Sequence, residues 1–276
     1  MQPVFDRLWH KVLRQPYQAV CTEDIGSGPP VVLLHGLGST SKVWEHLTTL
    51  LASNHRVLTF DLLGFGDSPK PDWLDYTVDD HAQAIWSAVK KRNVAGPIVF
   101  VGHSMGCLVA VHIARLHPGY VKRLVLYEMP LYTEASSLKR YTMLRKLYFA
   151  AYNRVLKHPN YSPSNARMIQ KLAARLAGFE ISKQTWTPFV KSLKNTIMTQ
   201  TTADDMKRLT IPMDVIYGSR DRVVLRAKAK EIFGVEATHI TTHIVESRHN
   251  ISPTASAFIT ECVDAGIMLE KATQQA

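Results

Sequence analysis

The chain has 276 residues, 46% of them hydrophobic and 20% charged, with a formal net charge of +10, a globular composition that can fill one large domain or one domain with an insertion. It has no run of about 18 or more uncharged apolar residues, and charges interrupt its N-terminal stretch too often for a secretory signal, so we expect a soluble cytoplasmic protein. Its cysteines, Cys21, Cys107 and Cys262, are odd in number and widely spaced, which argues against a disulfide framework or a zinc site and favours buried free thiols.

The first predicted element is an amphipathic helix within residues 1–14. Its apolar residues recur at helical spacing with Arg, Lys and His between them; they are Phe5, Leu8, Trp9, Val12 and Leu13. We expect this helix to pack on the body of the protein. The alternative is a helix that lies in a membrane interface, which leaves the same pattern and allows peripheral membrane association.

Short apolar runs then alternate with longer helical patterns over most of the chain. The expected strands are residues 30–36, 56–64, 97–104, 121–130, 213–221 and 239–247. The expected helices between and after them are residues 41–54, 78–94, 107–118, 225–233 and 253–272. Strands this uniformly apolar are typical of a parallel sheet covered by helices on both faces, so the fold class is α/β with a mostly parallel central sheet.

A basic segment interrupts this alternation. Residues 131–205 contain 12 Lys and Arg against four Asp and Glu, whereas the other 201 residues contain 21 against 19. Amphipathic patterns from Leu138 to Val155, over 162–178 and over 185–198 predict helices. We therefore expect residues 1–130 and 206–276 to form the core and residues 131–205 to form an inserted, basic helical cap.

The stretch Gly102-His103-Ser104-Met105-Gly106 lies where a predicted strand gives way to a predicted helix. This arrangement forces the serine into a sharp, strained turn, and glycines flank it because a Cβ there would collide with the neighbouring strand or helix. The serine hydroxyl then projects at the carboxyl edge of the sheet, where open α/β folds bind ligands. Ser104 is thus a candidate nucleophile.

A serine nucleophile needs a base, and the base needs a carboxylate that orients it. Asp221 and His249 each follow a later predicted strand, so both are expected at the same sheet edge as Ser104. Glu128 follows an earlier strand and is the reserve candidate for the acid. The predicted oxyanion hole consists of two backbone N–H groups. One belongs to Met105, and the other belongs to Leu37, just beyond the strand that ends in His35 and Gly36.

These motifs, in this order, resemble the α/β-hydrolase superfamily, specifically its capped serine hydrolases. They are His35-Gly36-x-Gly38, the stretch DLLGFGDSPKP at 61–71, the pentapeptide at 102–106, Gly218-x-x-Asp221 and His249. The resemblance implies an eight-stranded type of core sheet, a helical lid, and a structural turn at Asp61, Gly64 and Gly66. Ser104 stands where epoxide hydrolases and haloalkane dehalogenases carry aspartate, and Asn250 stands where many carbon–carbon bond hydrolases carry tryptophan.

The predicted activity is hydrolysis of a small or medium, partly apolar carboxylic ester through an acyl-enzyme, with no cofactor and no metal. The alternatives are a carbon–carbon bond, lactone or thioester hydrolase of the same fold, or a ligand receptor with little turnover. The basic cap suits an anionic substrate, an anionic lipid surface or an acidic partner. Nucleic acid is not expected, since no recognised binding module is present.

Overall fold

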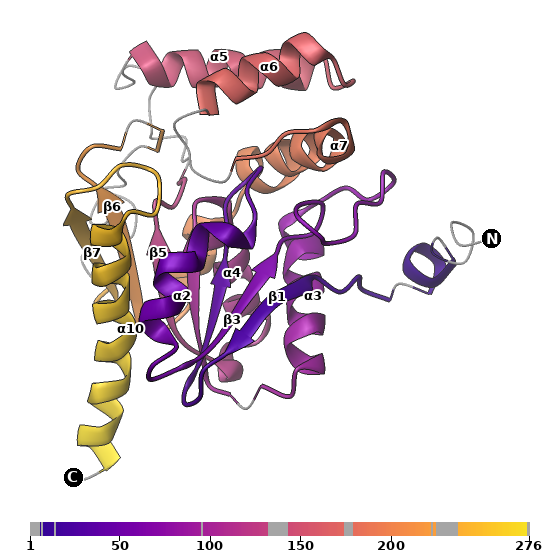
Figure 1. Cartoon of the computed structure of the whole chain (residues 1–276). Helices are drawn as coiled ribbons and strands as arrows, with labels where there is room; N and C mark the ends of the chain where they lie inside the picture. The colour runs from indigo at the N-terminus through magenta and orange to yellow at the C-terminus, as the bar shows by residue number, and fades with distance from the viewer. Residues whose placement is uncertain are drawn as a thin grey trace.

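A computed structural model gives the fold, and it describes residues 6, 8–13, 15–94, 96–131, 143–173, 179–221, 223–224 and 237–274. One seven-stranded sheet, in the order β1-β3-β2-β4-β5-β6-β7, organises this part of the chain (Figure 1). The strands are β1 (Val20–Ile25), β2 (Pro30–Leu34), β3 (Arg56–Asp61), β4 (Ile98–His103), β5 (Val121–Tyr127), β6 (Met213–Gly218) and β7 (Ile240–Val245). All neighbours pair in parallel except β1, which runs antiparallel to β3. The expected parallel α/β sheet is confirmed.

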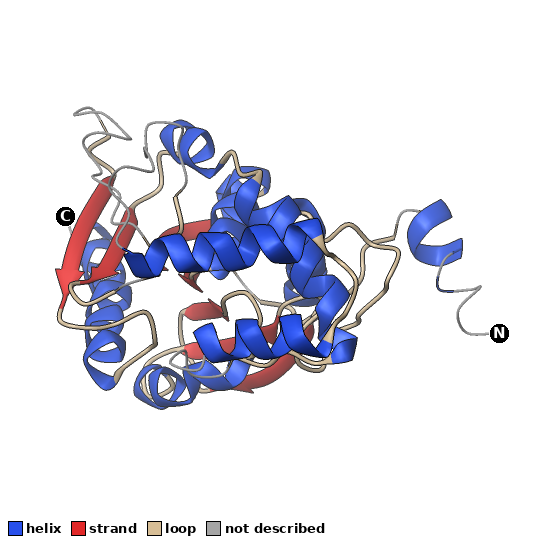
Figure 2. Ribbon diagram, turned by 90° about the horizontal axis from the view of Figure 1, so that it is seen from above, coloured by secondary structure: helices blue, strands red, loops and turns tan. Residues whose placement is uncertain are grey.

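Helices cover both faces of the sheet, as the view from above shows (Figure 2). After the N-terminal turn η1 (Leu8–Val12), the helices of the described residues are η2 (Ser41–Trp44), α2 (Glu45–Leu51), α3 (Val78–Lys91), α4 (Met105–Leu116), η3 (Pro118–Tyr120), α5 (Met143–Lys157), α6 (Pro163–Ala173), α7 (Lys183–Ser192), η5 (Leu193–Met198), α8 (Thr202–Arg208) and α10 (Pro253–Gln274). Alternate residues of β2 lie in two separate hydrophobic cores. Val32 and Leu34 belong to one, and Val31 and Leu33 belong to the other. The inner strands β2, β4 and β6 are mostly apolar because both of their faces are buried.

β1 was not predicted from the sequence. It reads VCTEDI, and most of its residues are exposed or half-buried. It is an edge strand that carries charges, and such strands lack the apolar run by which the buried strands are recognised. The expected helix at 225–233 lies outside the described residues, as do the N-terminal end of the expected helix from Leu138 and the C-terminal end of the one at 162–178.

The expectation that the N-terminal helix packs on the body is wrong for its described residues. The helical turn η1 (Leu8–Val12) projects from the body (Figure 1). Leu8, Trp9, Val12 and Leu13 are between 48% and 66% exposed. The His10 ring stacks on Tyr17, whose hydroxyl donates to Asp6, and these contacts connect the turn to the chain after it. The spacing of the apolar residues shows that the helix has an apolar face, but it does not show what that face contacts.

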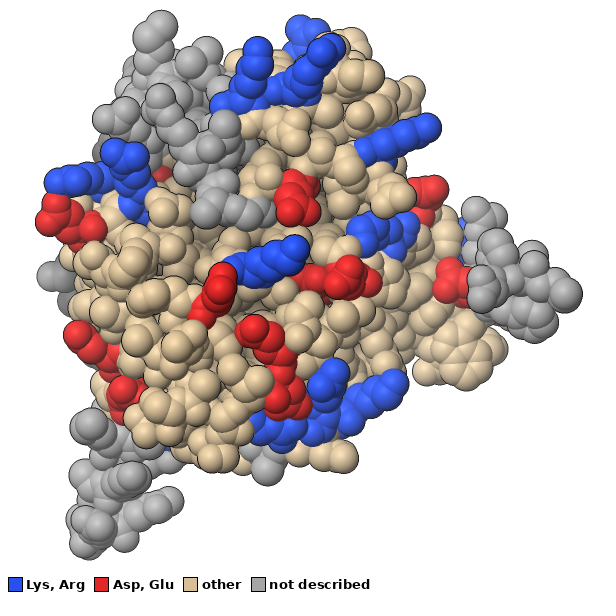
Figure 3. Space-filling model, viewed as in Figure 1, with Lys and Arg blue, Asp and Glu red and all other residues tan. Residues whose placement is uncertain are grey.

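Of the described helices between β5 and β6, α5, α6 and α7 lie over the carboxyl ends of the strands, with α5 and α6 outermost and α7 closer to the sheet (Figure 1). Helix α7 is joined to the core: Pro188 occupies the space that a Cβ on Gly64 would need, and the Ser192 hydroxyl lies 3.0 Å from His81 Nε2. Lys and Arg side chains gather over α5 and α6 in Figure 3. Among the described residues, no helix is both long enough and apolar enough to cross a membrane.

Candidate active site

Ser104 lies at the junction of β4 and α4, in the turn that the sequence predicts. Its φ is +51° and its ψ is −118°, a region that non-glycine residues seldom occupy. A Cβ on Gly106 would lie 2.1 Å from the Leu34 carbonyl oxygen, and a Cβ on Gly102 would lie 2.6 Å from the Cys107 nitrogen. Both neighbours are backbone, so the turn can form only because these two positions are glycine.

The loop after β2 lies directly against this turn. A Cβ built on Gly36 would lie 3.1 Å from the Ser104 Cβ, which places the following residue, Leu37, beside the serine. His35 fixes the loop: its Nδ1–H donates to the Gly36 carbonyl at 2.8 Å, and its Nε2 accepts from the Leu62 amide at 2.8 Å. Burial lowers the pKa of His35, so the ring is neutral and both nitrogens are occupied. His35 is therefore a structural residue of this loop.

Met105 is the first residue of α4, and the first N–H groups of a helix have no acceptor within the helix. The partial positive charge of the helix end adds to their attraction for an anion. The Met105 amide thus directly follows Ser104 in the chain, and Leu37 lines the same pocket as Ser104.

Asp221 and His249 are brought together at the same edge of the sheet. His249 Nδ1 lies 3.0 Å from Asp221 Oδ2, and both side chains are buried. Burial alone would raise the pKa of Asp221, but the charge of His249, together with hydrogen bonds from His249, Glu128 and the Val223 amide, holds this pKa below its ordinary value. An ionised Asp221 accepts the Nδ1–H of His249, so that in the neutral imidazole it is Nε2 that can accept a proton.

Glu128 follows β5 and is fully buried, with a φ of +54°. Its Oε1 accepts a hydrogen bond from the Gly218 amide at 2.6 Å, and its carboxylate lies within 4.8 Å of ligand atoms of Asp221 and His249. Glu128 therefore lies against Asp221, whereas the carboxylate that accepts a hydrogen bond from the His249 imidazole is that of Asp221.

One pocket contains both Ser104 and His249. Its volume is about 430 Å³ when the space open to solvent is included, and it is lined by Gly36, Leu37, Ser39, Val43, His103, Ser104, Phe179, His249, Asn250 and Ile251. No hydrogen bond joins the Ser104 hydroxyl to His249 among the described residues, which is common in ligand-free hydrolytic sites. The four aliphatic or aromatic side chains among the lining residues suit an apolar group.

Phe179 reaches this pocket from the segment between β5 and β6. The space that a Cβ on Gly38 would fill is taken by the Phe179 ring, 2.7 Å away, and the Glu180 amide donates to the Gly38 carbonyl at 2.7 Å. Phe179 was not predicted as a site residue, because no local pattern shows where a residue between two helices will lie. His103 and Tyr127, which contact the His249 loop, were missed as well.

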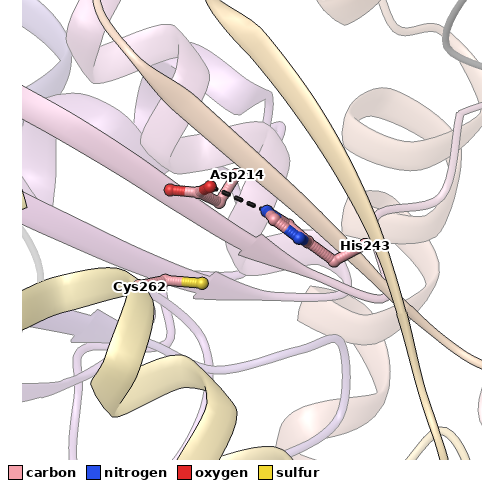
Figure 4. Close-up of side chains that lie close together, drawn as sticks. All are labelled: Asp214, His243 and Cys262. Atoms are coloured by element: carbon pink, nitrogen blue, oxygen red, sulfur yellow. Dashed lines mark hydrogen bonds and ion pairs between the residues drawn. The ribbon is translucent and has the colours of Figure 1, made fainter. Parts of the chain in front are cut away.

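A second cluster of polar side chains lies away from this pocket (Figure 4). Asp214, His243 and Cys262 have ligand atoms within 4.8 Å of one another. Asp214 already pairs with Arg123, and its Oδ1 lies 2.9 Å from His243 Nε2. Burial raises the pKa of Cys262 to about 12, so the thiol is protonated. The arginine disfavours a cation here, and the contacts of Asp214 with Arg123 and His243 join β5, β6 and β7.

A family model described as the alpha/beta hydrolase fold matches residues 29–254. This chain belongs to the α/β-hydrolase fold family. The expected fold and family are thereby confirmed, with seven strands described where the resemblance implied a sheet of the eight-stranded type.

Several curated members of this α/β-hydrolase family are similar in sequence. A 2-hydroxy-6-oxo-6-(2'-aminophenyl)hexa-2,4-dienoic acid hydrolase of Metapseudomonas resinovorans is 36% identical over 37% of this chain and 36% of its own length. The probable lysophospholipase BODYGUARD 1 of Arabidopsis thaliana is 35% identical over 42% of this chain and 26% of its own length. Lipase 3 of Moraxella sp. is 25% identical over 72% and 64%. The match thus spans only about a third or less of the first two relatives.

Solved structures share the fold at lower identity. A serine hydrolase involved in carbazole degradation has a TM-score of 0.65 at 22% identity, covering 89% of this chain and 93% of its own. A putative lipase of Acinetobacter baumannii has a TM-score of 0.65 at 20% identity, covering 97% of each chain. At such identities the likeness establishes the fold alone.

Proposed function

We propose that this α/β-hydrolase is a serine hydrolase that cleaves carboxylic esters through an acyl-enzyme intermediate. The observation that carries the proposal is one pocket lined by Ser104, in a strained strand-to-helix turn, and by His249, which is bonded to a buried Asp221. A strained turn that exposes a hydroxyl beside an oriented imidazole is the arrangement that serine nucleophiles require.

In this mechanism Ser104 Oγ attacks the ester carbonyl carbon while His249 Nε2 takes the hydroxyl proton. Asp221 holds the ring through Nδ1 and stabilises the imidazolium that forms. The Leu37 and Met105 amides donate to the negative oxygen of the tetrahedral intermediate. His249 then returns the proton to the leaving alcohol, and a water molecule, activated by the same imidazole, hydrolyses the acyl-enzyme.

We further propose that residues 131–205 act as a cap that forms part of the substrate pocket. Phe179 supports this, since it belongs to that segment and lines the pocket against Gly38. The apolar lining supports an ester with a short or medium apolar acyl group. Relatives named as lipase and lysophospholipase act on esters, which agrees with this reaction class.

A fluorophosphonate probe tests the nucleophile directly. We expect one equivalent to bind, with the adduct mapped by mass spectrometry to the peptide that contains Ser104, and we expect turnover of p-nitrophenyl acetate and butyrate that falls as labelling proceeds. An adduct on another residue, with Ser104 unmodified, contradicts the proposal. Labelling of Ser104 without turnover of any ester in a panel indicates a ligand receptor instead.

The change Phe179→Ala is expected to raise KM for p-nitrophenyl butyrate about fivefold, since it removes about 1 kcal/mol of apolar contact, while kcat changes less than twofold. The reason is that Phe179 lines the pocket but belongs to none of the proposed proton-transfer partners. Steady-state kinetics with acetate, butyrate and hexanoate esters measure the effect, which should grow with acyl length.

Phe258→Ala is the matched control, because this phenylalanine lies on α10 against His243, away from the pocket. It should leave KM unchanged for all three esters. Equal KM values in the wild type and Phe179→Ala would remove Phe179 from the substrate pocket and, with it, the main support for the cap.

A further inference from the structure

The loop between β7 and α10, which carries His249, is held by side chains from the middle of the sheet. The Tyr127 hydroxyl lies 2.6 Å from the Arg248 carbonyl oxygen and 3.1 Å from that of Asn250. His103 Nε2 lies 2.8 Å from the carbonyl oxygen of His249 itself. Three consecutive carbonyls around the imidazole thus lie within hydrogen-bonding distance of two side chains.

These two side chains, which we call the loop clamp, are also joined to the nucleophile. His103 and Tyr127 are register partners on the adjacent strands β4 and β5, and their rings stack with centroids 5.7 Å apart. His103 directly precedes Ser104, and the Tyr127 carbonyl accepts the Ser104 amide hydrogen at 2.9 Å. The clamp therefore ties the loop of the base to the same backbone positions that fix the serine.

Both members of the clamp keep the proton that the bond requires. Burial lowers the pKa of His103 to about 3, so its ring is neutral and carries one proton, which must be on the nitrogen that faces the carbonyl. The other nitrogen, Nδ1, is buried and has no partner among the described residues. Burial likewise raises the pKa of Tyr127, so its hydroxyl remains a donor.

We propose that Tyr127 and His103 are positioning residues, which hold the His249 loop where the imidazole can face the Ser104 hydroxyl. This inference rests on the proposed serine-hydrolase function. Neither residue transfers a proton in the reaction. Each affects the rate only by holding His249 in position. Apolar packing alone would keep the loop near the pocket, but two donors fix its register: the His103 N–H bonds to the His249 carbonyl, and the single Tyr127 O–H is shared between the Arg248 and Asn250 carbonyls.

Tyr127→Phe tests the hydroxyl while keeping the ring and its stacking. We expect kcat for p-nitrophenyl butyrate to fall about 10- to 100-fold, because small misplacements of a catalytic group cost about this much, with KM within twofold of wild type. Rates are expressed per Ser104 that a fluorophosphonate labels at completion, so that an unfolded fraction lowers the number of sites but not kcat.

Tyr76→Phe is the matched control. Tyr76 is also fully buried, and its hydroxyl donates to the Pro71 carbonyl at 3.0 Å, in a different loop. It should keep kcat per labelled site within twofold of wild type. Equal kcat values for Tyr127→Phe, Tyr76→Phe and the wild type would overturn the role of Tyr127.

Position 103 supplies a second, independent test. His103→Leu removes the donor to the His249 carbonyl, whereas His103→Gln places an amide N–H near the same point. We expect the leucine variant to lose about 10-fold or more in kcat and the glutamine variant to recover most of that loss. Equal kcat in the two variants overturns the clamp at this position. A failure of the serine-hydrolase proposal looks different, because Ser104 would then not be labelled in the wild type.

Discussion

Ser104→Ala is expected to lower kcat for p-nitrophenyl butyrate about 10⁶-fold and to change KM little. Alanine keeps the Cβ of serine, so the turn with its φ of +51° is equally strained and the fold should be preserved. What disappears is the oxygen that attacks the carbonyl. The remaining rate should come from the oxyanion donors and from substrate binding.

His249→Ala should lower kcat about as much as Ser104→Ala. The variant with both changes should have a kcat no lower than either single variant, since the two residues act as a unit. Single-turnover and steady-state rates on the purified variants measure this. Ser256→Ala is the control, because Ser256 is a buried serine in α10 and its replacement also removes a hydroxyl from the interior. This variant should retain activity. Turnover at the wild-type rate in Ser104→Ala would exclude the acyl-enzyme mechanism.

Most of the fold could be predicted because the buried strands carry their own signal. A parallel strand with helices on both faces is apolar at most positions, and β2, β4 and β6 show this in sequence and in burial, with His103 and Asp214 as buried polar exceptions. β1 could not be found in this way, since this exposed edge strand, VCTEDI, carries two acidic residues, whereas the other edge strand, β7, keeps the β-branched sequence ITTHIV. The position of η1 could not be found either, because amphipathicity reports an apolar face but not its partner.

The site residues likewise divide into those that the sequence could predict and those that it could not. Ser104, Asp221 and His249 each end or follow a strand, and the carboxyl ends of parallel strands meet at one edge, so their approach could be predicted. His103 and Tyr127 also end strands, but the sequence gives no sign that a ring nitrogen or a hydroxyl at these positions turns toward a loop more than 100 residues away. Such contacts depend on strand order and register, which only the structure supplies.

The second large effect on kcat is expected from the carboxylate that orients His249, for which Asp221 and Glu128 are the two candidates. Asp221→Asn is expected to lower kcat about 10⁴-fold. Asp221 Oδ1 accepts from the Val223 and Val224 amides, so an asparagine would keep its oxygen there and turn its NH₂ toward His249. That group donates to Nδ1, and the proton of the ring must then lie on Nε2, which can no longer accept from Ser104.

Glu128→Gln should cost less than about 10-fold in kcat. Glu128 accepts from the Gly218 amide with Oε1 and donates to Asp221 through its carboxyl, and a glutamine can reproduce both bonds with its carbonyl and its NH₂. Stopped-flow acylation rates and steady-state kcat, measured on both variants at equal labelled-site concentration, separate the two carboxyl groups. If Asp221→Asn stays active and Glu128→Gln does not, Glu128 is the acid, and the His249–Asp221 bond only positions the ring.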